Sequence, residues 1–123
     1  MSEYTEQAAL FEWATTVEGR IPDLAWLAHW PNGEYRTKAT AARLKAAGVR
    51  RGPPDIWLPV RRLHYVGFVC ELKARRGRLT PDQERWLAHL AAQGWWTGVY
   101  HDWTDAARAL CTYLGYPFQD LGL

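Results

Sequence analysis

Apolar residues recur every three or four positions in several stretches of the chain, which is the spacing of one face of an α-helix. In residues 3–18, Leu10, Ala14 and Val17 follow this spacing, and Gly19 comes directly after the pattern. Further helices are expected at residues 38–47, 81–93 and 103–114.

Shorter apolar runs predict β-strands, because strands need fewer residues than helices. Residues 24–30 are apolar but short, so strand and helix both remain open, and the turn-like Pro31-Asn32-Gly33 follows them. Residues 61–64 are expected to connect the first two strands as a hairpin. The strands are predicted at residues 55–60, 65–73 and 95–100.

The order of these elements predicts an α/β domain with a mixed β-sheet flanked by helices. The 123 residues are enough for one domain with its own hydrophobic core, and we expect a single domain over residues 1–123. Thr80, Pro81 and Gln83 stand at the N-cap, first and third positions of a helix, which is a capping-box pattern. Pro53 and Pro54 exclude regular structure just before the first long strand.

Charge is distributed very unevenly along the chain. Between Arg36 and Arg78 there are twelve basic residues and only two acidic ones, Asp55 and Glu71, whereas the remainder holds three basic and eleven acidic residues. A dense cluster of positive charge attracts nucleic acid through its phosphates. A solvated basic surface without a partner is the alternative.

Nothing in the sequence indicates a membrane or an oxidising compartment. No apolar run approaches the length that spans a bilayer, and the acidic N-terminus does not resemble a signal peptide. Cys70 and Cys111 are far apart, with no Cys-x-x-Cys pair. We therefore expect a reduced, cytoplasmic protein.

The two acidic residues of the basic region predict a metal and phosphate site. Glu71 and Lys73 are two positions apart on one expected strand, so their side chains project from the same face. Asp55 begins the neighbouring strand and brings its carboxylate to the same end. Two carboxylates and the backbone carbonyl of Leu72 suit a hard cation such as Mg²⁺ or Mn²⁺, which activates water and polarises a phosphoryl oxygen. Lys73 can orient that water or stabilise developing negative charge.

A Glu-x-Lys pair on a strand is, by itself, most often an exposed ion pair. Here the surrounding Phe68, Val69, Cys70 and Leu72 predict a largely buried strand, and charged residues on such a strand usually have a function. The preceding Pro-Asp and the basic surroundings favour the catalytic interpretation.

These motifs resemble the VRR-NUC domains of the PD-(D/E)xK nuclease superfamily, in their small phage and bacterial form. The resemblance rests on Val49-Arg50-Arg51-Gly52, the following Pro53-Pro54-Asp55-Ile56, Glu71-Leu72-Lys73-Ala74 and the segment Gly77-Arg78-Leu79-Thr80-Pro81-Asp82-Gln83. It extends from Ser2-Glu3 and Gln7 to Gly94 and so covers nearly the whole chain. A restriction-endonuclease-like fold is the fold that this resemblance implies.

The resemblance also implies roles for the matching residues. Asp55 and Glu71 would bind the metal, Lys73 would be the catalytic lysine, and Gln83 would contact the scissile phosphate or support the water. Capping its own helix is an equally good account of Gln83.

The first helix is implied to approach the same site. Glu3, one turn before Gln7, would be a supporting residue and a possible metal ligand, with a frayed terminus as the alternative. Glu6 is a possible substitute, one residue round the same helix.

Other residues give weaker indications. The tryptophans Trp86, Trp95 and Trp96 are expected in the core or an interface rather than as base-stacking platforms. His29, His64, His89 and His101 form no spaced cluster, and none is assigned as a ligand. The candidate DNA-binding residues, with a solvated surface as the alternative, are Arg36, Lys38, Arg43, Lys45, Arg50, Arg51, Arg75, Arg76 and Arg78.

The resulting prediction is a metal-dependent DNA endonuclease. Small members of the family resemble Holliday-junction resolvases that act as symmetric dimers, and the absence of a further recognition domain favours that function. A four-way junction presents two equivalent strands, which suits a two-fold dimer. The alternatives are a nuclease of the same fold that cuts flaps, duplex or RNA, and a DNA-binding protein without activity.

Overall fold

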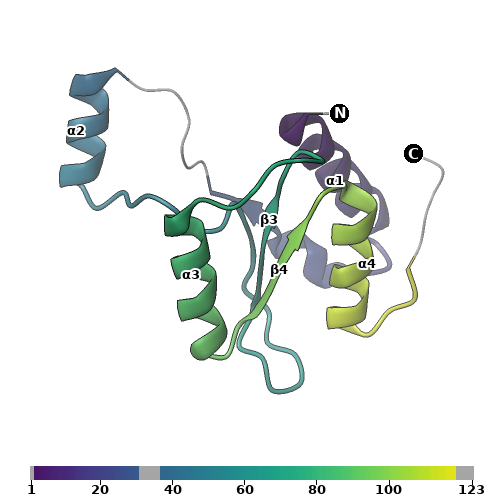
Figure 1. The fold of residues 1–123 in the computed structure, drawn as a ribbon. Coiled ribbons are helices and arrows are strands. Elements are labelled where there is room, and N and C mark those ends of the chain that lie inside the picture. Colours follow the sequence, from purple (N-terminus) through teal and green to yellow (C-terminus); the bar gives the residue numbers. More distant parts are fainter. Residues whose placement is uncertain (1, 31–36, 119–123) are drawn as a thin grey trace.

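The computed structural model describes residues 2–30 and 37–118 (Figure 1). Three long helices, one outlying helix and four strands follow one another in the order expected for an α/β fold. The elements are α1 (Glu3–Val17), a 3-10 helix η1 (Pro22–Trp26), β1 (Ala28–His29), α2 (Lys38–Ala46), β2 (Ile56–Leu58), β3 (Phe68–Leu72), α3 (Pro81–Ala92), β4 (Trp96–Tyr100) and α4 (Trp103–Leu114).

The four strands form one mixed sheet, which confirms the predicted fold class. Their order is β1-β2-β3-β4, with antiparallel pairing between the first three strands and parallel pairing between β3 and β4. The parallel pair requires a crossover, and α3 supplies it. β3 lies inside the sheet, and all five of its residues are buried.

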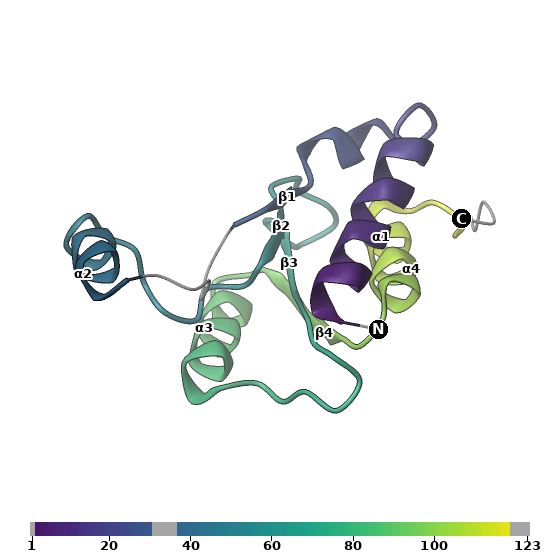
Figure 2. The ribbon, with the colours of Figure 1, turned by 90° about the horizontal axis from the view of Figure 1, so that it is seen from above.

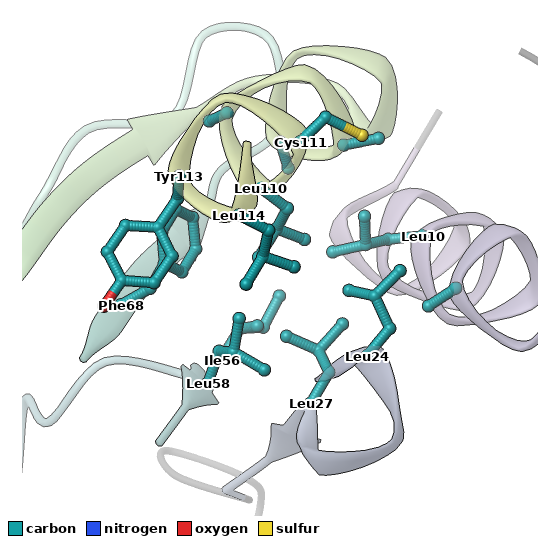
Figure 3. Packing of buried hydrophobic residues seen from close by; sticks show 14 of the residues in the cluster. Leu10, Leu24, Leu27, Ile56, Leu58, Phe68, Leu110, Cys111, Tyr113 and Leu114 are labelled. Carbon is teal, nitrogen blue, oxygen red and sulfur yellow. The ribbon is translucent and has the colours of Figure 1, made fainter. Parts of the chain in front are cut away.

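Helices cover the two faces of the sheet unequally. Figure 2 shows α1 and α4 together on one face and α3 alone on the other. Alternation along β3 sends Phe68, Cys70 and Leu72 into the core with α1 and α4, whereas Val69 packs with Leu87 of α3. Side chains that fill the larger core are labelled in Figure 3: Leu10, Leu24, Leu27, Ile56, Leu58, Phe68, Leu110, Cys111, Tyr113 and Leu114.

The helix boundaries follow from capping residues that the sequence displays. Thr80 and Gln83 form the predicted capping box at the start of α3, and the Ser2 side chain accepts from Thr5 N at the start of α1. Gly115 ends α4 in the left-handed conformation, with φ of +84°.

Three predicted segments differ in detail from the structure. Residues 24–30 contain both of the alternatives, since η1 is followed by the short strand β1. β2 ends at Leu58 rather than at residue 60, because Pro59 has no N–H to continue the ladder. β3 begins at Phe68 rather than at residue 65, because Tyr65 pairs with Arg62 inside the connecting loop.

The helix α2 stands apart from the sheet (Figures 1 and 2). None of its residues is buried, and its first turn is capped by the Thr37 side chain. The turn predicted at Pro31-Asn32-Gly33, and Arg36 after it, lie outside the described residues. No helix in the described part of the chain is long and apolar enough to cross a membrane.

Candidate active site

Asp55 and Glu71 lie opposite each other at one end of the sheet. The β2–β3 register pairs Ile56 with Cys70 and Trp57 with Val69, so one further step pairs Asp55 with Glu71. Directly opposed residues of an antiparallel pair have Cβ atoms roughly 5 Å apart. Both carboxylates project from the face that α3 covers, because they alternate with core residues. The register therefore brings together the two acidic residues that the sequence singled out.

The backbone of Asp55 is held by the edge of the sheet. Its carbonyl oxygen accepts a hydrogen bond from Trp30 N at 2.7 Å and one from His29 Nδ1 at 3.1 Å. Pro54 is buried, and its carbonyl oxygen accepts from Trp57 Nε1 at 2.5 Å. Asp55 is consequently fixed on both sides, which leaves its side chain a defined position.

Glu71 is a completely buried acid, with 0 % of its surface exposed. In the described part of the chain its carboxylate oxygens have no donor other than the carboxyl group of Asp55, with which Glu71 shares a hydrogen bond when one of the two acids is protonated. Burial and the neighbouring Asp55 carboxylate raise the pKa of Glu71 to about 9. A buried acceptor without a donor is costly, so this position calls for a positively charged partner.

Asp55 shares this environment. Burial raises the pKa of its carboxyl group, whereas a side-chain hydrogen bond with Glu71 and the charges of His29 and Lys73 act in the opposite direction. A pair of adjacent acids whose pKa values rise together holds fewer negative charges than two isolated acids at neutral pH. A divalent cation between them would release that constraint.

Lys73 follows β3 immediately and continues its alternation, so it lies on the same face as Glu71. Its backbone N–H donates to the Tyr100 carbonyl at 2.9 Å, which extends the pairing with β4 past the end of the strand. The positive charge of Lys73 acts to lower the pKa of both Asp55 and Glu71. The predicted Asp55, Glu71 and Lys73 thus form one electrostatic cluster.

The donor set fits a hard divalent cation. Two adjacent carboxylates are ligands of the kind that Mg²⁺ and Mn²⁺ prefer. In residues 2–30 and 37–118, no group of three or more His, Cys, Asp or Glu side chains surrounds a common metal position. Asp55 and Glu71 are therefore the acids that lie together, and further ligands would be backbone carbonyl, water or phosphate oxygens, or the more distant Glu3 carboxylate.

The acids of α1 are used differently from one another. Glu3 is exposed and lies within electrostatic range of the site, because its charge acts to raise the pKa of Asp55 and of Glu71. Glu6, offered above as its substitute, is 6 % exposed and accepts from Trp103 N at 2.7 Å. That bond satisfies a free N–H at the start of α4. Glu6 therefore has a structural role in capping α4, and its use as a substitute for Glu3 stays a prediction. Gln7 is half-buried on α1.

Gln83 caps the N-terminus of its own helix, which was one of the two roles expected for it. Its side-chain Oε1 accepts from Thr80 N at 2.9 Å, and its own N–H donates to Thr80 Oγ1 at 3.2 Å. Its amide Nε2 is a donor that can serve a phosphate oxygen, so the cap and a catalytic contact are compatible.

The start of α3 packs tightly on the loop that leads to Asp55. Gly52 has φ of +96°, and a Cβ there would lie 2.7 Å from the Asp82 carbonyl carbon. The indole Nε1 of Trp86 donates to the Arg51 carbonyl at 3.0 Å. Glycine is required at position 52 both by its backbone conformation and by this close approach. The contact explains why Gly52 precedes the site.

The predicted basic residues are exposed around this end of the sheet and on α2. Arg75 and Arg76 form the turn after β3, and Arg50 and Arg51 lie in the loop that leads to Asp55. The remaining described members of the set, all exposed, are Arg78 after the turn and Lys38, Arg43 and Lys45 on α2.

Two residues beside the site were missed by the sequence analysis. His29 was dismissed for want of a spaced cluster, and Trp30 was treated only as part of an apolar run. Both contact Asp55 across 25 or 26 residues of sequence through the β1–β2 pairing. Only that pairing could have revealed them, and β1 is too short to be recognised from its sequence.

Comparison with known proteins identifies the family and the fold. The sequence model of the VRR-NUC domain matches residues 2–102. A solved structure described as a VRR_NUC domain protein superposes with a TM-score of 0.76 and 21 % sequence identity, covering 98 % of this chain and 93 % of that chain. At this identity the likeness establishes the fold. A search of curated proteins found no significant match. Since the family match extends over most of its length, the chain belongs to the VRR-NUC domain family of PD-(D/E)xK nucleases.

Proposed function

We propose that this chain is a metal-dependent endonuclease that hydrolyses phosphodiester bonds in DNA. The observation that carries the proposal is the buried Glu71 carboxylate, which lies opposite Asp55 and beside Lys73 and has no donor among the described residues except the Asp55 carboxyl group. A carboxylate in this state is poorly suited to a purely structural role, because its burial costs free energy without a compensating bond. It is well suited to bind a cation and, through that cation, a phosphate.

Asp55 and Glu71 would hold Mg²⁺ or Mn²⁺, with the backbone carbonyl of Leu72 as a third ligand and Glu3 as a further candidate. When bound, the ion supplies a polarised phosphoryl oxygen and a water of lowered pKa. The site demands a cation with a preference for oxygen ligands, which Mg²⁺ and Mn²⁺ share.

The other residues act on the substrate and the water. Lys73 would orient the attacking water and stabilise the negative charge that develops on the phosphate. Gln83, held by its capping box at the N-terminus of α3, would donate from Nε2 to a phosphate oxygen. Arg75, Arg76 and Arg78 would bind the phosphates that flank the cleaved bond.

For the substrate, we favour four-way DNA junctions cut by a homodimer. A junction offers two equivalent strands, and a two-fold dimer presents two copies of the site in matching geometry. The basic surfaces, including the outlying α2, suit a substrate that extends beyond one duplex. Flap or duplex cleavage by the same site, and DNA binding without cleavage, are the outcomes that would displace this choice.

The test is cleavage of end-labelled junction, flap and linear duplex DNA with Mg²⁺, with Mn²⁺ and with EDTA. Lys73→Ala is the inactive variant, and Arg61→Ala is its control, since residue 61 is a basic position in the loop at the opposite end of the sheet. Paired, symmetric cuts in the junction that need metal and Lys73 would support a resolvase. Preferential cutting of flaps or duplex would keep the nuclease and remove the resolvase, and binding without cutting would remove the enzyme.

Sedimentation at the concentrations of the cleavage assay tests the dimer separately. A protein that sediments as a monomer and still makes paired cuts in one junction would contradict the dimer.

A further inference from the structure

An exposed tryptophan stands directly beside the candidate catalytic carboxylates. The backbone N–H of Trp30 donates to the Asp55 carbonyl at 2.7 Å, so the two residues are held next to each other across the β1–β2 edge. The side chain of Trp30 is nevertheless 58 % exposed. An indole that is fixed at its backbone and open at its ring can receive a flat ligand at little conformational cost.

A second indole supports the first. The rings of Trp30 and Trp57 have centroids 5.4 Å apart at an interplanar angle of 32°. Trp57 is fixed in turn by its bond to the Pro54 carbonyl and by edge contact with Trp95 at 5.3 Å. The three indoles form a continuous aromatic support, of which Trp30 is the exposed end.

The position of this support relative to the site defines its ligand. Trp57 is two residues beyond Asp55 on the same face of the sheet, which is about 6.6 Å along the strand. A nucleotide whose phosphate lies at Asp55 and Glu71 can therefore place its own or the adjacent base near Trp30. Bases within a duplex are already stacked, whereas an unpaired base has a free face that an aromatic side chain can cover.

We infer that Trp30, supported by Trp57, is a stacking site for an unpaired base next to the scissile phosphate. This inference rests on the proposed nuclease function and narrows its substrate to DNA with an unpaired nucleotide at or beside the cut, such as a branch point or a flap. Among exposed aromatic residues, Trp26 is 66 % exposed and has no ring contact among the described residues, so it lacks the support that Trp30 has. It provides a matched control.

The test is a binding cycle that pairs a protein change with a DNA change. All variants carry Lys73→Ala, so that the DNA is bound in Mg²⁺ without being cut. The DNA is a set of flap substrates, each with one abasic site at a different unpaired nucleotide near the branch. Trp30→Ala should weaken binding of the intact flap about 5- to 150-fold, which is the effect of losing one base–aromatic stack. Trp30→Phe should restore most of this loss, and Trp26→Ala should change affinity less than about twofold.

The decisive result is the coupling between the two changes. When Trp30 is present, an abasic site at one position should lower the affinity for the flap as much as Trp30→Ala lowers it for the intact flap. Combining the abasic site with Trp30→Ala should lower the affinity no further than either change alone. A 2-aminopurine base at that position should be quenched by Trp30 and not after Trp30→Ala. The inference would be overturned if the affinity losses caused by Trp30→Ala and by the abasic site multiplied at every position. It would also be overturned if Trp30→Ala weakened binding of fully paired duplex as much as binding of the flap.

Two further outcomes separate this inference from its alternatives. If Trp30→Ala abolished self-association in sedimentation and left DNA affinity unchanged, the ring would be a protein contact and the inference would be wrong. If the cycle showed coupling while the protein with Lys73 intact cut no DNA in any metal, the base site would stand and the nuclease proposal would fall.

Discussion

The two faces of the sheet are built from the same strands and serve different purposes. On the α1 and α4 face, Phe68 and Leu72 of β3 enter a large, closed apolar core. On the α3 face, the same strand contributes Val69 to a small cluster with Leu87 and Leu90, and then Glu71 to the site. One strand thus supplies packing to one side and chemistry to the other, because successive side chains alternate.

The comparison shows why a charged residue can be tolerated in the most buried strand. The larger core supplies the apolar burial that stabilises the fold, so the other face can accommodate the cost of Glu71 without its partner. Functional groups placed on a rigid interior strand also keep their positions better than groups on a loop. Substitutions on the two faces should therefore separate activity from stability.

The largest expected effect comes from a substitution on the α3 face, beside the acid pair, and it should change activity without changing stability. Lys73→Ala should lower the rate of DNA cleavage by about a thousandfold or more, since it removes the ammonium group whose charge acts on both acids of the pair. Thermal denaturation should give a Tm within about 2 °C of the wild type, because the Lys73 side chain is half-buried at the end of the strand. Loss of folding or of DNA binding in this variant would mean that Lys73 is a structural residue.

A substitution on the α1 and α4 face should have the opposite result, a loss of stability without a loss of activity. Leu110 is completely buried in α4 within the large core, and Leu110→Ala should lower the free energy of unfolding by about 3 kcal/mol. The rate per folded molecule should stay near that of the wild type, because this face does not carry the acids. Leu87→Ala on the α3 face is the control.

Leu87 retains 9 % exposure in the smaller cluster, so the Leu87→Ala variant should lose less stability, on the order of 2 kcal/mol. Its helix carries Gln83, so it should lose more activity than Leu110→Ala. Equal stability losses, measured by urea denaturation, would remove the distinction between the faces.

Periodicity predicted much of this division. The two-residue spacing of Glu71 and Lys73 predicted that they share a face, and the capping pattern at Thr80 located the start of α3. Both signals are local, because they depend on backbone geometry over a few residues. The resemblance to a known family then supplied the roles that spacing alone could not.

Contacts between distant segments could not be predicted. The use of Glu6 to cap α4 joins positions 97 residues apart, and nothing near Glu6 in the sequence indicates it. The contact of His29 with Asp55 depends on a strand of two residues, whose pattern is too short to read. The end of β2 was misplaced for a different reason, since Pro59 was visible and its missing N–H was overlooked.

The dependence of stability on pH measures how much the ionisation of the buried Glu71 destabilises the α3 face of the sheet. Its pKa in the folded protein is about 9, well above the ordinary value of 4.5. The unfolded chain therefore releases the proton first, and the stability of the metal-free protein should fall as pH rises between these two values. The raised pKa of Asp55 acts in the same direction.

Glu71→Gln should remove most of this decline. In EDTA at pH 8 we expect the variant to have a higher Tm than the wild type, while it loses cleavage activity. Mg²⁺ should raise the Tm of the wild type and not that of the variant. The exposed Glu12→Gln on α1 is the control and should follow the wild type. A wild-type Tm that stays constant from pH 5 to 9 would contradict the burial argument.

The smallest expected effect is on DNA binding by the exposed arginines beside the acid pair. Arg75 and Arg76 are exposed in the turn after β3, so replacing both with alanine should leave stability unchanged and weaken DNA binding at low salt. Each phosphate contact contributes about 0.9 to the slope of log affinity against log salt, so the slope should decrease by about 1.8. Arg61→Ala, in the loop at the other end of the sheet, should leave the slope as it is. If Arg61→Ala lowered the slope and the double variant did not, the DNA would cross the sheet at the end away from Asp55 and Glu71. The acid pair would then lie outside the path of the substrate, and the division between a structural face and a catalytic face would no longer explain why Glu71 is buried.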